Sequence, residues 1–221
     1  NRRRNGEEYP QWLSIAVIRH RNKSIAHYVA LFSDISDRKK AEEILRHQAM
    51  HDPLTRLPNR VMFDERLRSS LSRAKRLNRR VALLYLDLDN FKIINDSLGH
   101  LAGDRVLQMV ADRLRACLRL EDMVARIGGD EFSAVLDDVD SADDAIATAE
   151  RIIISLGDVD CSGGGEGIQT SIGIALYPDH GTNTEELLHH ADNAMYTAKR
   201  MGRGRSFLAG TTSDDEESTE K

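Results

Sequence analysis

The order of apolar and polar positions predicts that strands and helices alternate from residue 53 onward. Apolar runs of strand length occupy residues 81–89, the hairpin 123–136, residues 168–177 and residues 205–209. Between them, apolar residues recur at helical spacing over about 60–76, 102–118, 142–156 and 184–201. This alternation predicts an α/β domain in which a sheet is layered with helices.

The segment before residue 53 has a different pattern. Residues 9–19 and 25–34 are predicted strands, and the polar residues between them suit a hairpin. Two strands alone do not form a stable domain, so they must pack on another element, pair with a second copy or be the remnant of a truncated module. Residues 36–52 form a predicted charged helix with a short apolar face. That face would either seat a partner helix in a parallel pair or belong to a solvated linker.

Composition narrows the possible functions. The chain has 221 residues, enough for one α/β domain with appendages, and a net charge of −5, which is not the basic surface of a nucleic-acid binder. No apolar run reaches the 18 residues of a membrane span, so we expect no membrane contact by this segment. Two cysteines indicate neither a disulfide framework nor a cysteine metal site. Residues 209–221, with five acids and no large apolar residue, are predicted to be disordered.

Two carboxylates end the apolar run 81–89. Because a strand alternates its faces, Asp87 and Asp89 are expected to point the same way. The simplest interpretation is that the strand has reached solvent there. A second interpretation is that the two acids belong to a site at the end of the sheet.

A glycine turn carries a second acidic pair. Gly128 and Gly129 are expected to form a two-residue turn, both with positive φ, followed by Asp130 and Glu131. Taken alone, this is an ordinary hairpin turn. If the hairpin lies beside Asp87, however, the crowded carboxylates would repel unless a divalent cation, Mg²⁺ or Mn²⁺, joins them. Glycine also lets a ligand approach the backbone, so the pattern indicates phosphoryl or nucleotidyl transfer.

Several motifs in order resemble the GGDEF domain of bacterial diguanylate cyclases. They are HDPLTRLPNR, LDLDNFKIINDSLGHLAGDRVL, RIGGDEF, TSIGIALYP and ADNAMYTAKRMGRGR, which together span roughly residues 50–208. The resemblance implies a five-stranded, mostly antiparallel sheet surrounded by helices, similar to the palm of nucleotidyl cyclases and polymerases. It also implies a bacterial, cytoplasmic enzyme that condenses two GTP into cyclic di-GMP and releases two pyrophosphates. The full-length protein could be anchored to a membrane upstream.

The segment before this match resembles the last strands of a PAS sensor domain and its exit helix. The implied division is residues 1–35 for the truncated PAS domain, 36–52 for the linker helix, 53–208 for the catalytic domain and 209–221 for the tail. Most of the sensor is missing, so we expect no haem or flavin in this chain. A phosphodiesterase domain of the EAL type often follows GGDEF domains of this kind.

The resemblance assigns roles to the acids and to one lysine. Asp87, the backbone carbonyl of Leu88, and Asp130 would hold Mg²⁺ (or Mn²⁺) on the triphosphate. Glu131 would assist metal binding or deprotonate the attacking 3′-hydroxyl, and which acid is the base stays open. Lys92 would neutralise charge on the phosphates during in-line displacement.

The same resemblance supplies the remaining substrate contacts. Asn95 and Asp104 would bind guanine, His100 would contact substrate, and Lys199 and Arg203 would meet the terminal phosphates. The last two are four residues apart, so they share a helix face if the helix extends past Gly202. Local alternatives exist: Asn95 could belong to a turn or cap, and Asp104 could be a first-turn acid favoured by the helix dipole.

Regulation and assembly follow from two further features. Arg119 and Asp122 form an RxxD pair shortly before Gly128, where many members of the family bind product, although chance matches to RxxD are common. We therefore expect feedback by cyclic di-GMP. One site holds one GTP, so two domains must face each other as a homodimer. The alternative function is a catalytically silent module that binds GTP or cyclic di-GMP and regulates a linked phosphodiesterase.

Overall fold

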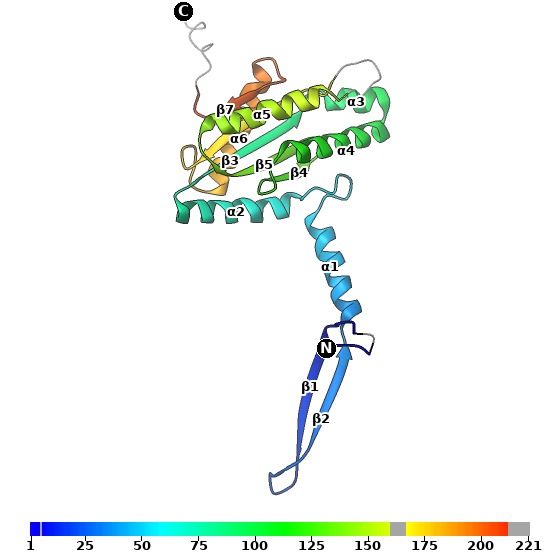
Figure 1. Cartoon of the computed structure of the whole chain (residues 1–221). Helices are drawn as coiled ribbons and strands as arrows, with labels where there is room; N and C mark the ends of the chain where they lie inside the picture. Colours follow the sequence, from blue (N-terminus) through cyan, green and yellow to red (C-terminus); the bar gives the residue numbers. More distant parts are fainter. Residues whose placement is uncertain (5, 160–166, 212–221) are drawn as a thin grey trace, which may run out of the picture. The chain divides into compact units, whose positions relative to one another are not determined.

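The computed structural model describes residues 1–4, 6–159 and 167–211, and it divides the chain into two compact units, residues 1–49 and 50–221 (Figure 1). The predicted disordered tail lies outside the described residues from residue 212 onward. None of the helices in the described ranges is both long enough and apolar enough to cross a membrane.

The first unit is a hairpin followed by a helix. It comprises β1 (Gln11–Arg19), β2 (Ile25–Asp34) and α1 (Ser36–Met50), and β1 pairs antiparallel with β2. The hairpin exposes large apolar side chains, including Trp12 and Phe32, and α1 buries none of its residues. The predicted hairpin and helix are therefore present, and their apolar faces are uncovered.

The second unit is a sheet with helices on both faces. Its elements are α2 (Arg60–Leu77), β3 (Arg80–Leu88), α3 (Phe91–Leu98), α4 (His100–Cys117), β4 (Met123–Gly128), β5 (Glu131–Val139), α5 (Ala142–Gly157), β6 (Thr170–Tyr177), α6 (Thr184–Arg200) and β7 (Ser206–Leu208). The strand order is β4-β5-β3-β6-β7, and only β6 and β7 pair in parallel. The predicted five-stranded, mostly antiparallel sheet is confirmed.

Strand β3 lies in the middle of the sheet, and its alternation sorts the core into two layers. Val81 and Leu83 face the layer that contains α2 and α6, whereas Leu84 and Leu86 face the layer of α4 and α5. Both faces are covered, which explains why β3 is apolar along almost its whole length. The same alternation puts Asp87 on the α6 side at the end of the strand.

Helix α3 was missed by the sequence analysis, which placed a single helix over 102–118. The chain forms α3 first and then α4, with a break at Gly99, whose φ is +82°. Two apolar residues of α3, Ile93 and Leu98, are exposed, so the segment has no continuous buried face. Periodicity therefore could not identify it.

Helix α6 packs so closely on β6 that one strand position requires glycine. A Cβ built on Gly173 would lie 1.8 Å from the carbonyl oxygen of Ala191 and 2.3 Å from the backbone nitrogen of Met195. Since both atoms are backbone, only a shift of the whole helix could make room.

We expect Gly173→Ala to lower the free energy of unfolding by about 3 kcal/mol, because overpacking of a buried contact costs that order of energy. Urea unfolding of the variant and the parent measures the difference. Gly157→Ala is the matched control, because a Cβ there meets nothing within 4 Å. A loss below about 0.5 kcal/mol for Gly173→Ala would contradict this close packing.

Candidate active site

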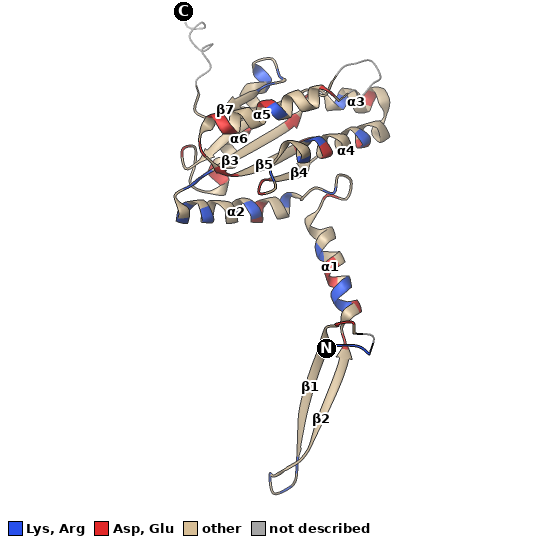
Figure 2. Ribbon diagram, viewed as in Figure 1, with Lys and Arg blue, Asp and Glu red and all other residues tan. Residues whose placement is uncertain are grey.

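The end of β3 gathers the acids that the sequence analysis singled out. Asp87 pairs with Glu131 of β5 on one side and with Ser171 of β6 on the other. The backbone N–H of Leu88 donates to the carbonyl oxygen of Asp130 at 3.3 Å. The β4–β5 turn therefore lies directly beside the end of β3, as predicted. In Figure 2 most of the β3 ribbon is tan, and its end is red, the colour of Asp and Glu.

The turn is displaced by one residue from its expected position. Gly128 pairs with Glu131, so the central residues are Gly129 and Asp130. Only Gly129 has a positive φ, +54°, which corrects the expectation for both glycines. The cause is a register shift between Arg126 and Gly128, a bulge that moves the turn along the chain. As a result, Asp130 stands at the tip of the hairpin.

Arg126 ties this turn to the start of the domain, and the sequence analysis missed it. Its Nε and Nη2 donate to the carbonyl oxygen of Gly129 at 3.0 and 2.8 Å, and its Nη1 donates to Asp52 at 3.0 Å. Asp52 also accepts from the backbone N–H and the hydroxyl of Thr55. Burial raises the pKa of Asp52, but these hydrogen bonds outweigh it and hold the pKa below its ordinary value.

Asp87 is half-buried and forms an ion pair with Lys199, whose Nζ lies 2.7 Å from Oδ1. Burial raises the pKa of Asp87; the bond from Lys199 lowers it, and the charges of Asp130 and Asp89 raise it further. The net direction is upward, mainly because of burial, and the neighbouring carboxylates of Asp130 and Asp89 add to it. That is the electrostatic setting in which a divalent cation binds favourably.

Two carboxylates and one carbonyl are the oxygen donors at this edge. Asp87, Asp130 and the backbone oxygen of Leu88 belong to hard ligand types that suit Mg²⁺. Among the described residues, no three His, Cys, Asp or Glu side chains are grouped closely enough to hold a metal by themselves. The donor set therefore fits an ion that takes its remaining ligands from water and phosphate oxygens.

Asp89 differs from Asp87 in its surroundings, although only Leu88 lies between them. Its side chain has no exposed surface; both oxygens accept from the Ser171 hydroxyl, at 2.9 and 3.0 Å, and Oδ2 accepts from the N–H of Gly204 at 3.1 Å. Strand β3 ends at Leu88, so its alternation does not extend to Asp89. The expectation that Asp87 and Asp89 point the same way is therefore not met. The carboxylate of Asp87 is partly exposed, whereas that of Asp89 is enclosed.

Glu131 is partly buried beside a tyrosine. The Tyr85 hydroxyl donates to Glu131 Oε2 at 3.3 Å. Burial, together with the negative charge of Glu131, raises the pKa of Tyr85 to about 12. Tyr85 therefore stays protonated and keeps its donor directed at Glu131, which the sequence analysis did not anticipate.

The predicted guanine-binding residues lie on α3 and α4. Asn95 is half-buried within α3, which excludes the turn-or-cap alternative, while His100 and Asp104 are exposed on α4. A Cβ on Gly103 would lie 1.9 Å from Asn95 Oδ1. Gly103, which the sequence analysis did not single out, therefore leaves the space that the Asn95 side chain occupies.

The predicted cationic residues differ in their secondary structure and in the residues around them. Lys92 is exposed in the first turn of α3. Helix α6 ends at Arg200, and Arg203 follows with φ +62°, so Lys199 and Arg203 do not share a helix face as predicted. Gly202, with φ +109°, explains why the helix stops. Arg203 nevertheless lies near the acids, with Nε 3.8 Å from Asp89.

Arg119 and Asp122 lie between α4 and β4. The carboxylate of Asp122 accepts from the backbone N–H groups of Arg119 and Asp137, at 3.1 and 3.2 Å, and the Arg119 side chain is exposed. Both residues line a hollow of about 430 Å³. Burial raises the pKa of Asp122, while these backbone hydrogen bonds oppose the rise. The motif is thus folded with its guanidinium open to solvent.

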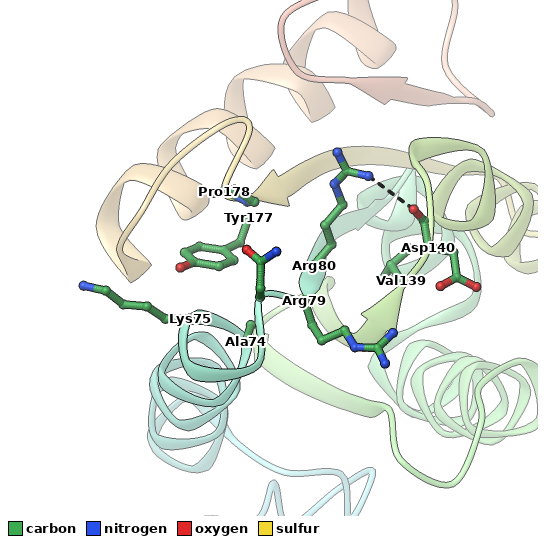
Figure 3. Close-up of a pocket in the computed structure, with 9 residues that line it drawn as sticks. Ala74, Lys75, Arg79, Arg80, Val139, Asp140, Tyr177 and Pro178 are labelled. Carbon is green, nitrogen blue, oxygen red and sulfur yellow. Dashed lines mark hydrogen bonds between the residues drawn. The ribbon is translucent and has the colours of Figure 1, made fainter.

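A separate hollow of about 400 Å³ lies at the opposite end of the sheet, where β3 begins and β5 and β6 end (Figure 3). Arg80 donates there to the carbonyl oxygen of Asp140 at 3.2 Å. The lining residues are Ala74, Lys75, Asn78, Arg79, Arg80, Val139, Asp140, Tyr177 and Pro178. None of the predicted site residues is among them, so this hollow is distinct from the acidic edge.

The comparisons with known proteins agree with this fold. A family model described as diguanylate cyclase, GGDEF domain, matches residues 49–205. Diguanylate cyclase TpbB of Pseudomonas aeruginosa is 49% identical over 167 residues, which are 75% of this chain and 38% of TpbB. The bifunctional diguanylate cyclase/cyclic di-GMP phosphodiesterase MucR of the same species is 44% identical over 165 residues, 74% of this chain and 24% of MucR. The chain thus spans well under half the length of either relative.

Solved structures show the same similarity. The GGDEF domain of P. aeruginosa TpbB matches with a TM-score of 0.69 and 48% identity, covering 72% of this chain and 94% of that one. The coiled coil and GGDEF domain of Caulobacter crescentus DgcB, in complex with c-di-GMP, matches with a TM-score of 0.72 and 29% identity, covering 79% and 93%. The chain belongs to the GGDEF family of diguanylate cyclases.

Proposed function

We propose that the second unit condenses two GTP molecules into cyclic di-GMP and releases two pyrophosphates. The observation that carries this proposal is the meeting of the Asp87 strand end with the turn that bears Asp130, beside Lys199. Acids at a glycine turn next to cations are suited to a nucleoside triphosphate, because the acids bind the metal and the cations bind the phosphates.

Asp87, Asp130 and the Leu88 carbonyl would hold Mg²⁺ or Mn²⁺. When bound, the metal ion would neutralise charge on the triphosphate and on the developing leaving group. Lys199 contacts Asp87 in this structure, so it must give up that contact for the ion and is then free to meet phosphate oxygens. Lys92 and Arg203 supply further positive charge.

The chemical step is in-line displacement at the α-phosphorus. The 3′-oxygen of one GTP forms the new P–O bond while the bond to pyrophosphate breaks, and the hydroxyl proton passes to a carboxylate. Glu131 and Asp130 are the candidate bases. Repetition of the step in the other direction closes the ring, so that two GTP give one cyclic di-GMP and two pyrophosphates.

Selection for guanine would come from α3 and α4. A carboxylate at Asp104 can accept from both N1–H and the 2-amino group of guanine, a donor pair that adenine lacks. Asp104 is exposed in this structure, so the bound base must cover it for the discrimination to be strong. Asn95 lies nearby on α3 and offers both donor and acceptor groups.

We expect Gly103→Ala to weaken GTP binding about tenfold, because the added methyl group displaces the Asn95 side chain and removes a hydrogen bond to the base. Stability should change by less than about 1 kcal/mol, since alanine has the better helix propensity. Titration calorimetry with GTP and Mg²⁺ measures the affinity. Equal affinity in the variant and the parent would show that Asn95 does not bind the base.

Two copies of the domain must face each other, since each site holds one GTP. We expect the initial rate per chain to rise with protein concentration in the range where dimers form, and to level off above it. Helix α1, whose Ile44 and Leu45 are about 60% exposed, is the element proposed to pair the copies. Rates that stay proportional to protein concentration at every dilution, with a monomer seen in sedimentation, would exclude this requirement.

Incubation with GTP and Mg²⁺, followed by mass spectrometry, tests the function directly. We expect cyclic di-GMP from GTP, no cyclic dinucleotide from ATP, and no product from Asp130→Ala. Binding of GTP without turnover by the parent would instead support the regulatory module. In a longer protein, an EAL phosphodiesterase domain would be the partner of such a module.

Feedback by product is proposed to act at Arg119 and Asp122. A guanidinium suits phosphate oxygens and guanine edges, and the Arg119 side chain is open to solvent beside a hollow of about 430 Å³. The complex of DgcB with c-di-GMP shows that a member of this family binds this dinucleotide.

A further inference from the structure

We propose that Asp89 is a positioning residue that holds the segment Gly202–Arg205 on the end of β3, so that Arg203 meets the triphosphate. The inference rests on the proposed function for the identity of the ligand. It assigns Asp89 a role that differs from that of Asp87, although the two carboxylates are two residues apart in the sequence.

The hydrogen bonds of Asp89 leave little capacity for a metal ion. Both oxygens accept from the Ser171 hydroxyl, Oδ2 also accepts from the Gly204 N–H, and Arg203 Nε lies 3.8 Å from Oδ1. The side chain has no solvent-exposed surface. A buried carboxylate is tolerated when such donors surround it, and removing the donors or the acceptor leaves an uncompensated group.

The segment that Asp89 holds has an unfavourable backbone conformation. Gly202, Arg203 and Gly204 have φ values of +109°, +62° and +58°, and Arg203 is not a glycine. A non-glycine residue in the left-handed region costs about 1 kcal/mol, so the surrounding contacts must impose it. Such contacts include the bond from the Arg203 N–H to the carbonyl oxygen of Ala198 in α6, the bond from the Ile172 N–H to the carbonyl oxygen of Arg205, and the bond from the Gly204 N–H to Asp89.

The two acids thus hold the two cations in different ways. Asp87 is partly open and binds Lys199 directly, a contact that a metal ion can replace. Asp89 is enclosed and bonds to the backbone next to Arg203, a contact that can remain when the guanidinium moves to phosphate. Asp89 therefore keeps Arg203 close to the site in both states.

Measurement of nucleotide binding without divalent cations distinguishes the positioning role of Asp89 from metal binding. In buffer with EDTA, we expect Asp89→Ala to weaken GTP binding about tenfold or more, and Asp89→Asn about threefold, because asparagine keeps one acceptor oxygen for Gly204. GMP, which lacks the terminal phosphates, should bind both variants within about twofold of the parent. Equal losses for GTP and GMP, or a loss that appears only with Mg²⁺, would overturn the proposal.

The Gly204 amide gives a second measurement that needs no nucleotide. We expect its hydrogen exchange, followed by NMR, to be about 10- to 100-fold faster in Asp89→Ala and only a few-fold faster in Asp89→Asn. Asp112→Asn, on an exposed side chain of α4, should change neither exchange nor GTP affinity. Unchanged exchange in Asp89→Ala would contradict the bond on which the proposal depends.

If Asp89→Ala does not fold, Asp89→Asn and Ser171→Ala decide the question. Ser171→Ala removes one donor to Asp89, so it should weaken GTP binding about two- to threefold and leave GMP binding unchanged. No preferential loss for GTP in either variant would overturn the proposal. A parent that makes no cyclic di-GMP from GTP and Mg²⁺ would instead refute the proposed function, since these measurements use neither metal nor turnover.

Discussion

Turnover of GTP to cyclic di-GMP is expected to fall by about a thousandfold or more in Asp87→Asn. Asparagine keeps the size of the side chain but removes the negative charge that would bind the metal ion, and the loss of one preorganised electrostatic contact at a phosphoryl-transfer site already costs a factor of that order. Lys199 keeps an oxygen to bond, and the pair is partly exposed, so the fold should be retained. Product formation by chromatography and thermal unfolding measure the two effects.

The matched control for this variant is Asp112→Asn. Its carboxylate is 78% exposed on α4 and pairs only with a neighbour one turn away in the same helix, so turnover should stay within about twofold of the parent. If Asp87→Asn retained a tenth of the parent's turnover, Asp87 would not be a metal ligand, and the acids at the end of β3 would need another explanation.

Inhibition by cyclic di-GMP is expected to weaken about 30-fold or more in Arg119→Ala, while uninhibited turnover stays within about twofold. A bidentate guanidinium–phosphate contact is worth that much in affinity, and the exposed Arg119 side chain is available to make it. Initial rates at increasing product concentration, with pyrophosphate removed enzymatically, give the inhibition constant for each variant.

Arg113→Ala is the matched control for Arg119→Ala. Arg113 is an exposed arginine on α4 that does not line the hollow beside the RxxD pair, so its loss should leave inhibition unchanged. Inhibition that is as strong in Arg119→Ala as in the parent would move the product site elsewhere. A parent that shows no inhibition at all would remove feedback from the proposed function and leave catalysis unaffected.

Several features of the fold could be predicted because local sequence determines them. The apolar run of β3 predicts a strand covered on both faces, and the motif LDLDNF places carboxylates at its end. Both follow from the local order of apolar and charged residues, because a strand that is buried on both faces is apolar at nearly every position. The glycine turn and its acids could also be identified from the residues. The resemblance to a known family then supplied their roles and the lysines, and the structure brings Asp87, Asp130 and Lys199 to one edge.

Other features depend on contacts between residues far apart in the chain. The bulge after Arg126 moves the turn by one residue, and the bond from that arginine to Asp52 spans 74 residues. Asp89 and Gly204 are 115 residues apart. Neither local periodicity nor motif spacing predicts such pairs, because their hydrogen-bond donors and acceptors come together only once the sheet has formed.

The amino-acid sequence alone therefore determined most of the strands and helices, though not α3, as well as which positions face the core and that Asp87 ends a strand. Only the tertiary structure decided that Asp87 stays partly open while Asp89 is enclosed, and that Arg203 leaves the helix yet remains beside the acids. The physical reason is that the periodicity of apolar residues indicates only the face of a strand or helix on which a residue lies. The desolvation and hydrogen bonding of a carboxylate depend on what the rest of the chain places around it.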